Sequence, residues 1–410
     1  MLWKSSTLLQ KADAEKLFRF SKQWNLKYAS PSAVTTHKLQ FTKTPSSLPI
    51  YQVLTFDGSL CQKHTSSVDA VLTKDLARKM LETMVRQTVI DKILHDCQRQ
   101  GRVSFYLSSE GELASIVGSA AGLQATDTIY GQYRESAALL YRGYSMDKMI
   151  AQCVGSIEDS ALGRQMPIHY GSKLHNFHTI SSPVGTQLTQ AAGCGYGFRV
   201  ADSQSVCMCY FGEGTASEGD FHAALNMSAT LRCRTVFFCR NNAFAISTSC
   251  VAQYAGDGVA GRGGAYGVPS VRVDGNDALA VLIAVRQARE MSIANNTPVL
   301  IEAMTYRQDD HSTSDDSTQY REVPQDCLPD PITRLERFIT SKGWWKSGET
   351  TLLQETTRET IRKLISRHES LPKPCDRTLL DHVYDAKPPN LIKQTSEICT
   401  KEIDFLISPE

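Results

Sequence analysis

One stretch of sequence, from Cys207 to Ser247, limits the folds open to this chain more than any other. A β-branched and aromatic run ends at Phe211 and is followed at once by Gly212-Glu213-Gly214. A helix-compatible segment then leads to a second apolar run, which ends at Asn241-Asn242. We interpret this order as strand, acidic glycine turn, helix, strand and amide loop. Parallel strands joined by one crossover helix end at the same edge of a sheet, which is where open α/β sheets bind ligands.

The two turns would bring the carboxylate of Glu213 and the amide of Asn242 together at that edge. An oxygen-only pair suits Mg²⁺ held through a phosphate, because Mg²⁺ prefers hard ligands and completes its octahedron from substrate and water. A glycine–acid–glycine sequence is equally consistent with a tight strand-to-helix turn that binds no ligand. The residues of this unit alone therefore leave both interpretations open.

Strand and helix patterns alternate on both sides of this unit. Apolar residues recur at helical spacing from Thr73 to about Gln100, and strand-like runs occupy 270–273 and 299–304. This alternation predicts an α/β fold, a mostly parallel sheet with helices on both faces. A further helix is predicted from Thr186, with glycine at positions 193, 195 and 197. Because glycine costs about 1 kcal/mol per helical position, these glycines predict close approach of another backbone, either within this chain or from a partner subunit.

Composition excludes several classes of protein. Hydrophobic residues at 41% and charged residues at 21% are typical of a globular protein. The formal net charge of +1 gives no support for a nucleic-acid partner, and no apolar run is long enough to cross a membrane. Twelve cysteines are scattered without a C-x-x-C pair, which predicts free thiols in a reducing compartment.

We expect four regions along the chain. Residues 1–35 carry six Lys or Arg against two acids and predict either a mitochondrial presequence or a disordered basic arm. Residues 36–66 predict an extended N-terminal arm, and 67–328 the α/β domain. Residues 329–410 predict a helical C-terminal extension, with Trp344-Trp345 as an anchor and a helix from about residue 355 to residue 368, and a tail broken up by prolines. Within the α/β domain, the polar stretch 307–321 predicts an exposed loop.

The spacing of Glu213 and Asn242, 29 positions (242 − 213), resembles the thiamin diphosphate fingerprint. From about residue 50 to residue 384 the chain resembles the alpha subunits of the decarboxylating component of branched-chain 2-oxo acid dehydrogenases. The matching segments include CQRQGRVSFY, GQYRE, GRQMPIHYGSK, ISSPVGTQ, CYFGEGTASEGD, FFCRNNAFAIST, RVDGND and HSTSDD. The pyruvate-specific branch is the nearest alternative, but the Ser-Thr-Ser-Asp-Asp run after His311 favours the branched-chain branch.

The resemblance implies a thiamin diphosphate-binding fold and a set of binding residues. It makes Glu213, Asn242 and the backbone carbonyl of Phe244 the ligands of Mg²⁺. The implied cofactor-binding residues are Tyr133, Arg134, Ser182, Val184, Glu213, Gly214, Arg240, Asn242 and His311. A structural K⁺ site is implied at Ser181, Pro183, Thr186 and Gln187.

His311 is the candidate catalytic residue. Its ordinary pKa near 6.5 lets an imidazole accept or donate a proton near neutrality, although a lone loop histidine is usually only solvated. The resemblance assigns it contact with a 2-oxo acid. Ser312 matches a regulatory phosphoserine, where a phosphate would add about −1.5 to −2 charges beside an anion-binding site and reduce activity. We expect Arg307 and Asp315 to hold this loop.

The resemblance also implies partners and a location. In the family, the glutamate that acts on the aminopyrimidine ring belongs to the beta chain. We therefore expect a beta subunit in an α₂β₂ heterotetramer, and no decarboxylation by the isolated chain. A lipoyl transacylase core, a kinase and a phosphatase are further expected partners, and the mitochondrial matrix is the expected compartment.

The chain departs from the family pattern at several positions. Ala243-Phe244 stands where the family has Gly-Tyr, so a positive φ at Ala243 would be strained. Asp309-Asp310 precedes His311, and we expect these acids to weaken substrate binding or to raise the pKa of His311. Glu322 replaces a second phosphoserine, and the ending at Glu410 puts a family inter-subunit contact in doubt. A non-catalytic paralogue with the same fold, and a metal-dependent phosphate-binding module, stay as alternatives.

Overall fold

The computed structural model describes residues 39, 41, 47–322 and 330–407. The predicted presequence or arm at residues 1–35 and the predicted boundary at residue 329 lie outside the described residues, as does most of 36–46. The chain divides into residues 1–45 and residues 46–410, and every helix and strand named below belongs to the second unit.

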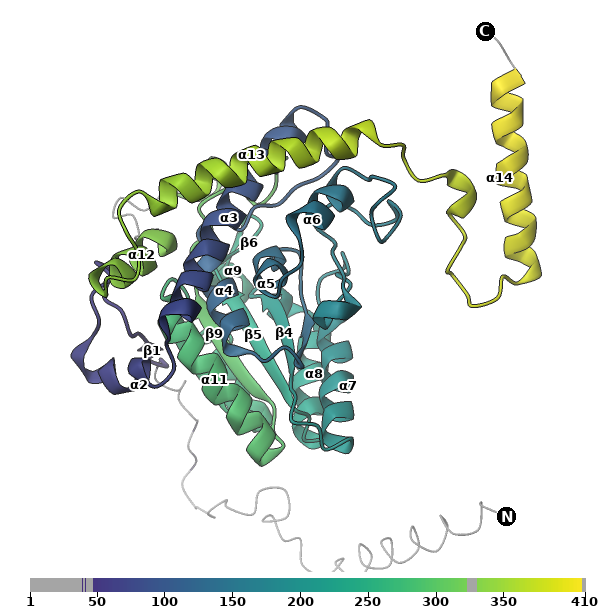
Figure 1. The fold of residues 1–410 in the computed structure, drawn as a ribbon. Helices are drawn as coiled ribbons and strands as arrows, with labels where there is room; N and C mark the ends of the chain where they lie inside the picture. The colour runs from purple at the N-terminus through teal and green to yellow at the C-terminus, as the bar shows by residue number, and fades with distance from the viewer. Residues whose placement is uncertain (1–38, 40, 42–46, 323–329, 408–410) are drawn as a thin grey trace, which may run out of the picture. The chain divides into compact units, whose positions relative to one another are not determined.

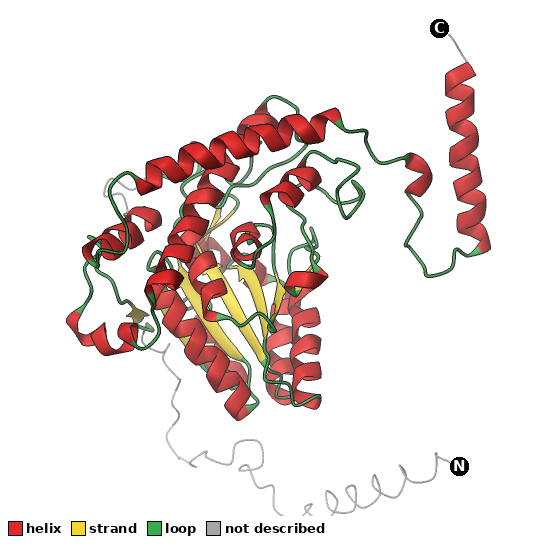
Figure 2. Ribbon diagram, viewed as in Figure 1, coloured by secondary structure: helices red, strands yellow, loops and turns green. Residues whose placement is uncertain are grey.

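A seven-stranded sheet forms the centre of this unit (Figure 2). Its strand order is β1-β8-β9-β5-β4-β2-β3, and every neighbouring pair is parallel. The predicted mostly parallel α/β sheet is therefore confirmed. A separate antiparallel pair, β6-β7, follows β5. The strands are β1 (Ile50–Tyr51), β2 (Thr128–Tyr130), β3 (Phe177–His178), β4 (Cys207–Gly212), β5 (Thr235–Asn241), β6 (Phe244–Ala245), β7 (Thr248–Ser249), β8 (Ser270–Asp274) and β9 (Val299–Met304).

Side chains of the central strands alternate between two hydrophobic cores. In β4, Met208 and Tyr210 belong to one core, whereas Cys209 and Phe211 belong to the other. The strands β5 and β9 alternate in the same way. Because successive side chains of a strand point to opposite faces, a sheet covered on both faces requires apolar residues at every position. This requirement explains the continuous apolar runs in the sequence.

Helices cover both faces of the sheet (Figure 1). The helices α3, α4, α5 and α11 pack with the first core, and α7 and α8 pack with the second. The helices are α2 (Thr65–Asp69), α3 (Lys74–Arg99), α4 (Leu113–Gly122), α5 (Ser136–Tyr141), α6 (Met146–Cys153), α7 (Thr186–Val200), α8 (Gly219–Thr230), α9 (Cys250–Gln253), α10 (Gly263–Tyr266), α11 (Ala278–Asn295), α12 (Pro331–Ser341), α13 (Glu349–Ser370) and α14 (Pro389–Ile407).

Helix-capping residues explain where two of these helices begin. The hydroxyl of Thr73 accepts a hydrogen bond from the backbone N–H of Leu76, which fixes the predicted start of α3. Asp277 caps α11 by accepting from Leu279 and Ala280. The second oxygen of Asp277 accepts from the backbone N–H groups of Val53 and Leu54, at 2.8 and 2.6 Å. One carboxylate therefore starts a helix and fixes the segment that follows β1.

The strand β1 lies at one edge of the sheet and pairs with β8. The register joins Ile50 to Arg272, 222 positions later (272 − 50). Ser47 and Leu48 lie just before β1. Asp257 accepts hydrogen bonds from Ser47 Oγ and from the N–H of Leu48. Arg272 donates to the carbonyl of Leu48 at 3.1 Å. The edge strand β1, which is the first strand in the chain, is therefore held by residues from the second half of the chain.

The C-terminal helices differ from the prediction in extent. The predicted helix from about residue 355 to residue 368 is α13, which is longer and spans Glu349–Ser370. Pro389 was expected to break the tail, but it begins α14 instead. Proline is tolerated at the first helical position because no intrahelical partner is lost there. Trp345, the expected anchor, is buried beneath the guanidinium of Arg78, 4.5 Å from the ring centroid.

A cluster of charged residues ties α13 to α6. Arg367 donates to Asp147 at 2.7 Å and to Glu158 at 2.5 Å, and His368 Nε2 lies 3.0 Å from Asp147. One histidine and two carboxylates at this spacing resemble a metal site. Because Arg367 is ion-paired with both carboxylates, we interpret the cluster as an ion-paired contact between helices.

None of the helices in the described part of the chain combines the length and the apolar character needed to span a bilayer. The ten cysteines whose side chains the structure describes are all free, in agreement with the expectation from their spacing.

The glycines of α7 fulfil the close-approach prediction at one position. A Cβ atom on Gly195 would overlap Thr235 Oγ1 at the start of β5 and approach the backbone of Arg234. At Gly193 and Gly197 no described atom lies within 4 Å of that position. Only Gly195 is therefore required by the packing of α7 on the sheet.

Gly195→Ala tests this packing. We expect it to lower the free energy of unfolding by about 1 to 3 kcal/mol, because the added methyl group would displace the start of β5. The matched control, Gly197→Ala, should raise that free energy by up to about 1 kcal/mol, because alanine favours the helix and meets no obstacle. Urea denaturation of both variants measures the difference, and equal effects would contradict this account.

Candidate active site

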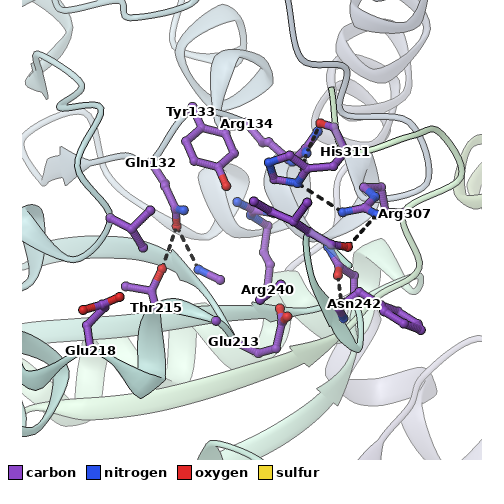
Figure 3. A pocket seen from close by; sticks show the side chains of 16 residues that line it. Gln132, Tyr133, Arg134, Glu213, Thr215, Glu218, Arg240, Asn242, Arg307 and His311 are labelled. Atoms are coloured by element: carbon purple, nitrogen blue, oxygen red, sulfur yellow. Dashed lines mark hydrogen bonds between the residues drawn. The ribbon is translucent and has the colours of Figure 1, made fainter. Parts of the chain in front are cut away.

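The carboxyl ends of β2, β4, β5 and β9 surround a cavity of about 320 Å³. Figure 3 shows Glu213, which follows β4, Arg240 and Asn242, at the end of β5, and His311, from the loop after β9, around this space. Nine of the predicted site residues line the cavity, and Ser182, Ser312 and the predicted K⁺ ligands do not. The lining residues are Gln132, Tyr133, Arg134, Val184, Gly212, Glu213, Gly214, Thr215, Glu218, Arg240, Asn242, Phe244, Ala245, Ile246, Arg307 and His311.

Glu213 follows directly after β4 and is 2% exposed. Its Oε1 atom is buried and has no hydrogen-bond partner among the described residues. Burial raises the pKa of Glu213, and the nearby carboxylate of Glu112 raises it further. A buried carboxylate oxygen without a partner costs free energy that a bound cation would recover.

Asn242 comes to the same place from the end of β5. Two successive side chains cap the turn that follows this strand: Asn241 Oδ1 accepts from the N–H of Ala243 at 3.0 Å, and Asn242 Oδ1 accepts from the N–H of Phe244 at 3.2 Å. These bonds hold Ala243 at φ 71°. The strain expected at Ala243 is therefore present, and Ile246 shares it at φ 56°.

A buried ion network lies behind these ligand candidates. Arg240 donates through Nε to Glu135 at 2.6 Å and through one terminal nitrogen to Glu112 at 3.1 Å. Glu112 also accepts from Thr305 at 2.9 Å and from Asn242 at 3.4 Å. Burial opposes the ionisation of Glu112, but Arg240 and Arg134 outweigh it and hold the pKa of this carboxyl below its ordinary value.

No role was predicted from the sequence for Glu112, Glu135 or Gln132. Gln132 joins the network through its Oε1, which accepts from the N–H of Gly212 at 2.9 Å. GQYRE was one of the matching segments, but nothing in its local pattern, or in that of residues 108–112, shows which residues Glu135 and Glu112 contact.

His311 is held between two arginines. Its Nδ1 lies 3.3 Å from Arg134 and 3.2 Å from Arg307, and Arg134 also donates to its carbonyl oxygen at 2.7 Å. Because guanidinium nitrogens only donate, Nδ1 accepts and the ring proton resides on Nε2. Burial, followed by the charges of Arg134 and Arg307, lowers the pKa of His311 to about 4. The imidazole is therefore neutral at pH 7.

The loop that carries His311 differs from the prediction of an exposed segment. Arg307 is 2% exposed and donates to Tyr320 Oη at 2.8 Å. Asp315 accepts from that same hydroxyl at 2.5 Å and from the N–H of His311 at 2.8 Å. The expectation that Arg307 and Asp315 hold the loop is confirmed, and their hydrogen bonds explain why a polar segment is partly buried.

The two extra acids do not raise the pKa of His311, so that part of the expectation was wrong, whereas weaker substrate binding stays a prediction. Asp309 accepts from Ser108 Oγ at 2.5 Å, and Asp310 accepts from the N–H of Ser317 at 2.8 Å. Both carboxylates are therefore used in contacts that hold the loop, while Arg134 and Arg307 face the imidazole. The feature that favoured a non-catalytic paralogue thus belongs to the loop's own structure.

The segment before α7 lies beside the cavity and enters it with one residue. Val184 lines the cavity, whereas Ser182 Oγ donates to His169 Nε2 at 2.7 Å, since His169 Nδ1 faces the carbonyl of Pro167. Of the predicted K⁺ ligands, Thr186 Oγ1 lies 3.3 Å from the carbonyl oxygen of Pro183. Gln187 is buried and donates to the carbonyl of Tyr210 at 3.0 Å, and Ser181 is half-buried.

Ser312, the predicted phosphorylation site, lies next to His311 in the loop. It is half-buried, and its Oγ accepts a long hydrogen bond, 3.4 Å, from the N–H of Ser314. Its carbonyl accepts from the N–H of Asp315 at 3.0 Å. Glu322, which replaces the second family phosphoserine, is exposed at the end of the same loop.

These features define a class of protein. A parallel α/β sheet whose carboxyl edge presents an amide, several arginines and an acid with one oxygen unpaired among the described residues is suited to a cofactor with phosphate and a divalent cation. A neutral histidine on an adjoining loop adds a proton donor of the kind used by enzymes.

Comparison with known proteins identifies the family. The sequence pattern of the family described as Dehydrogenase E1 component matches residues 81–375, and the chain belongs to this family. It is 45% identical over 377 residues to 2-oxoisovalerate dehydrogenase subunit alpha, mitochondrial, of Homo sapiens, covering 90% of this chain and 84% of that protein. The proteins of the same name in Caenorhabditis elegans and Dictyostelium discoideum are 45% and 44% identical over 93% and 88% of this chain, covering 89% and 83% of their own lengths.

Ala243→Gly tests the strain in the turn after β5. We expect it to raise the free energy of unfolding by up to about 1 kcal/mol, because glycine adopts positive φ without the steric cost that alanine carries. Ala245→Gly is the control and should lower the same free energy by about 0.5 to 1 kcal/mol, since glycine weakens a strand. Thermal unfolding measures both variants. A loss of stability in Ala243→Gly as large as in the control would refute the strain.

The pKa of His311 predicts how its contribution to stability depends on pH. The folded value lies near 4 and the ordinary value is 6.5, so between these limits the unfolded chain binds a proton that the folded chain does not. Acidification through this window therefore removes stability. In His311→Asn this loss is absent, so the free-energy difference between variant and parent should shift in favour of the variant from pH 7 to pH 5. Urea denaturation at both pH values checks it; an unchanged difference would mean an ordinary imidazole pKa.

Proposed function

We propose that this chain is the alpha subunit of 2-oxoisovalerate dehydrogenase, a thiamin diphosphate-dependent enzyme. It would decarboxylate the 2-oxo acids derived from Leu, Ile and Val and transfer the acyl group to a lipoyl carrier. The observation that carries the proposal is the buried Oε1 of Glu213, which lacks a partner among the described residues and lies at the same cavity as Asn242. Membership of the Dehydrogenase E1 component family and the names of the relatives support it.

The cavity residues fit a diphosphate and a divalent cation. Glu213, Asn242 and the carbonyl of Phe244 would hold Mg²⁺, an all-oxygen set of the kind that this ion prefers. The backbone at Gly214 approaches β6 so closely that a Cβ there would lie 2.6 Å from that of Ala245. Tyr133, Arg134 and Arg240 would face the diphosphate, and Ser182 and Val184 the aminopyrimidine ring. When bound, thiamin diphosphate supplies carbanion stabilisation for decarboxylation.

His311 would act on the substrate as a neutral hydrogen-bond donor. With Nδ1 occupied by Arg134 and Arg307, its Nε2–H is free to donate to an oxygen of the 2-oxo acid. The two guanidinium groups favour an anionic substrate in the same place. Tyr133, Val184 and Ile246 add apolar surface to the cavity, which suits a branched aliphatic side chain.

The K⁺ site remains part of the proposal at Ser181, Pro183, Thr186 and Gln187. Hydroxyl, carbonyl and amide oxygens suit a weakly hydrated cation, and the 3.3 Å between Thr186 Oγ1 and the Pro183 carbonyl brings two such oxygens together. A cation there would fix the start of α7 and, through it, the segment that carries Ser182 and Val184.

We infer that the beta subunit completes the active site in an α₂β₂ heterotetramer. In the family that the chain resembles, the glutamate that acts on the aminopyrimidine ring belongs to the beta chain. The two buried acids nearest Arg240, Glu112 and Glu135, are ion-paired with it, and Glu213 is assigned to the metal. By the same family analogy the lipoyl transacylase core, a kinase and a phosphatase are partners, with Ser312 as the phosphorylated residue. The names of the relatives support a mitochondrial location, and we place the chain in the matrix.

Co-expression with a beta subunit and assay across a panel of 2-oxo acids tests the function. We expect turnover of 3-methyl-2-oxobutanoate well above that of pyruvate, and none by the isolated chain. His311→Ala should lower kcat by about 10²- to 10⁴-fold, the usual contribution of a positioned proton donor. Glu213→Ala should abolish binding of thiamin diphosphate with Mg²⁺, measured by calorimetry on the tetramer.

Glu218→Gln is the matched control, since Glu218 lines the cavity but is exposed and has no assigned role. It should retain cofactor binding and turnover. A clear preference for pyruvate would favour the pyruvate-specific branch. Equally poor cofactor binding by the parent and by Glu213→Ala would favour a non-catalytic paralogue.

A further inference from the structure

Ile246 has a backbone conformation that β-branched residues rarely adopt. It lies at φ 56° and is the first of the two residues, Ile246 and Ser247, that connect β6 to β7. The strands are paired through Ala245 and Thr248, so the connection is a two-residue hairpin turn. The favoured turns of this length require a positive φ at the first position, where glycine or asparagine is usual. An isoleucine is strained there, because its branched side chain crowds the backbone.

Packing in the core does not explain this strain. In the described part of the chain, Ile168 is the other β-branched residue with a positive φ, at 65°. Ile168 is 1% exposed, belongs to the first hydrophobic core and donates through its N–H to Gln152 Oε1 at 3.0 Å. Ile246 is 53% exposed and, among the described residues, belongs to neither core. It lines the candidate active-site cavity instead, so its side chain is available to a molecule bound there.

The turn that carries Ile246 is joined to the loop that carries His311. One terminal nitrogen of Arg307 donates to the carbonyl oxygen of Ile246 at 3.4 Å, and the other lies 3.2 Å from His311 Nδ1. The rings of Phe244 and Tyr320 also bring β6 and this loop together, with their centroids 5.9 Å apart. A single buried guanidinium therefore fixes the position of Ile246 relative to the imidazole.

The cavity offers few positions for an alkyl group. Val184 and Ile246 are the branched aliphatic residues among those that line it in the described chain, and the proposed function assigns Val184 to the aminopyrimidine ring. The carboxylate and oxo groups of a 2-oxo acid would face Arg134, Arg307 and His311. The alkyl group of that acid is then left to the apolar wall that Ile246 provides.

We propose that Ile246 is a specificity-determining residue, whose side chain contacts the alkyl group of a branched 2-oxo acid. The strained turn and the bond from Arg307 hold this side chain at a set distance from His311. A branched alkyl group reaches the wall, whereas the methyl group of pyruvate is too short to make the same contact. The selectivity rests on the proposed function, but the strain in the turn does not.

Ile246→Ala in the co-expressed alpha–beta complex tests the selectivity. We expect the ratio of kcat/KM for 3-methyl-2-oxobutanoate to that for pyruvate to fall at least about tenfold, the usual effect of removing a methylene-sized contact from an apolar pocket. Ile246→Val keeps the branched Cβ and should lose less. Val251→Ala is the control and should behave as the parent, because Val251 is 90% exposed and does not line this cavity. An unchanged ratio in Ile246→Ala would overturn the proposal.

Ile246→Asn tests the strain without reference to catalysis. Asparagine tolerates positive φ, so the full alpha chain carrying this change should melt at a higher temperature than the parent. Ile246→Ala keeps a Cβ atom at the same φ and should show a smaller rise. An Ile246→Asn chain that melts at or below the parent temperature would contradict the strain and overturn the argument from it.

Two further outcomes separate this proposal from its rivals and from the proposed function. A weaker heterotetramer in Ile246→Ala, measured by sedimentation, with an unchanged kcat/KM ratio would assign the side chain to the subunit interface and overturn the proposal. In a complex without turnover, calorimetric titration of the same two acids gives their relative affinities. A tenfold fall of that relative affinity in Ile246→Ala would support the role of Ile246 while contradicting the proposed function, and an unchanged relative affinity would contradict both.

Discussion

The buried ion network around Arg240 is the interaction on which the candidate active site depends. Arg240 is the last residue but one of β5, Glu135 precedes α5 and Glu112 precedes α4, so one guanidinium joins three segments at the carboxyl edge of the sheet. Burying such charges costs desolvation free energy, which their mutual attraction offsets only where the geometry is good and the remaining hydrogen bonds are made. Glu112 meets that requirement through Thr305 and Asn242.

The same network explains why Glu213 is available to a ligand. Arg240 is occupied by two other carboxylates, so Glu213 is left as the cavity acid with a buried oxygen that has no partner in the described chain. Arg134 and Arg307 are turned toward the imidazole of His311. Positive charge therefore surrounds the histidine, whereas a buried carboxylate oxygen at the sheet edge has no cation or hydrogen-bond donor beside it in the described chain. This separation of charge suits a metal-bound diphosphate on one side and an anionic substrate on the other.

Local patterns in the sequence were sufficient to predict the elements of the fold. The apolar runs of β4 and β5 and the cap at Thr73 each act over a few residues, and so these two strands and the start of α3 were found where they were expected. The prediction that Pro389 breaks the tail was wrong because the effect of a proline depends on whether it starts a helix or interrupts one. The positive φ at Ala243 was anticipated only because the family has glycine there.

Contacts between distant residues were beyond the reach of the sequence. Arg240 and Glu112 are 128 positions apart, and Ser108 and Asp309 are 201 apart. No periodicity or motif couples such positions, so neither the role of Glu112 nor the burial of Arg307 had a local signal. The effect of Asp309 and Asp310 on the pKa of His311 was mispredicted for the same reason. That effect depends on the directions of their side chains, which are set by contacts with Ser108 and Ser317.

The position of β1 has a consequence for how the chain is assembled. This strand is among the earliest parts of the sheet to be synthesised, yet its partner β8 lies 222 positions later. At ribosomal rates of roughly 5 to 20 residues per second, that interval takes on the order of 10 to 40 s. The edge of the sheet therefore cannot close during most of translation, and β1 joins a structure that the rest of the chain has already begun to build. The strand β1 is therefore early in the sequence but is one of the last strands to pair in the sheet.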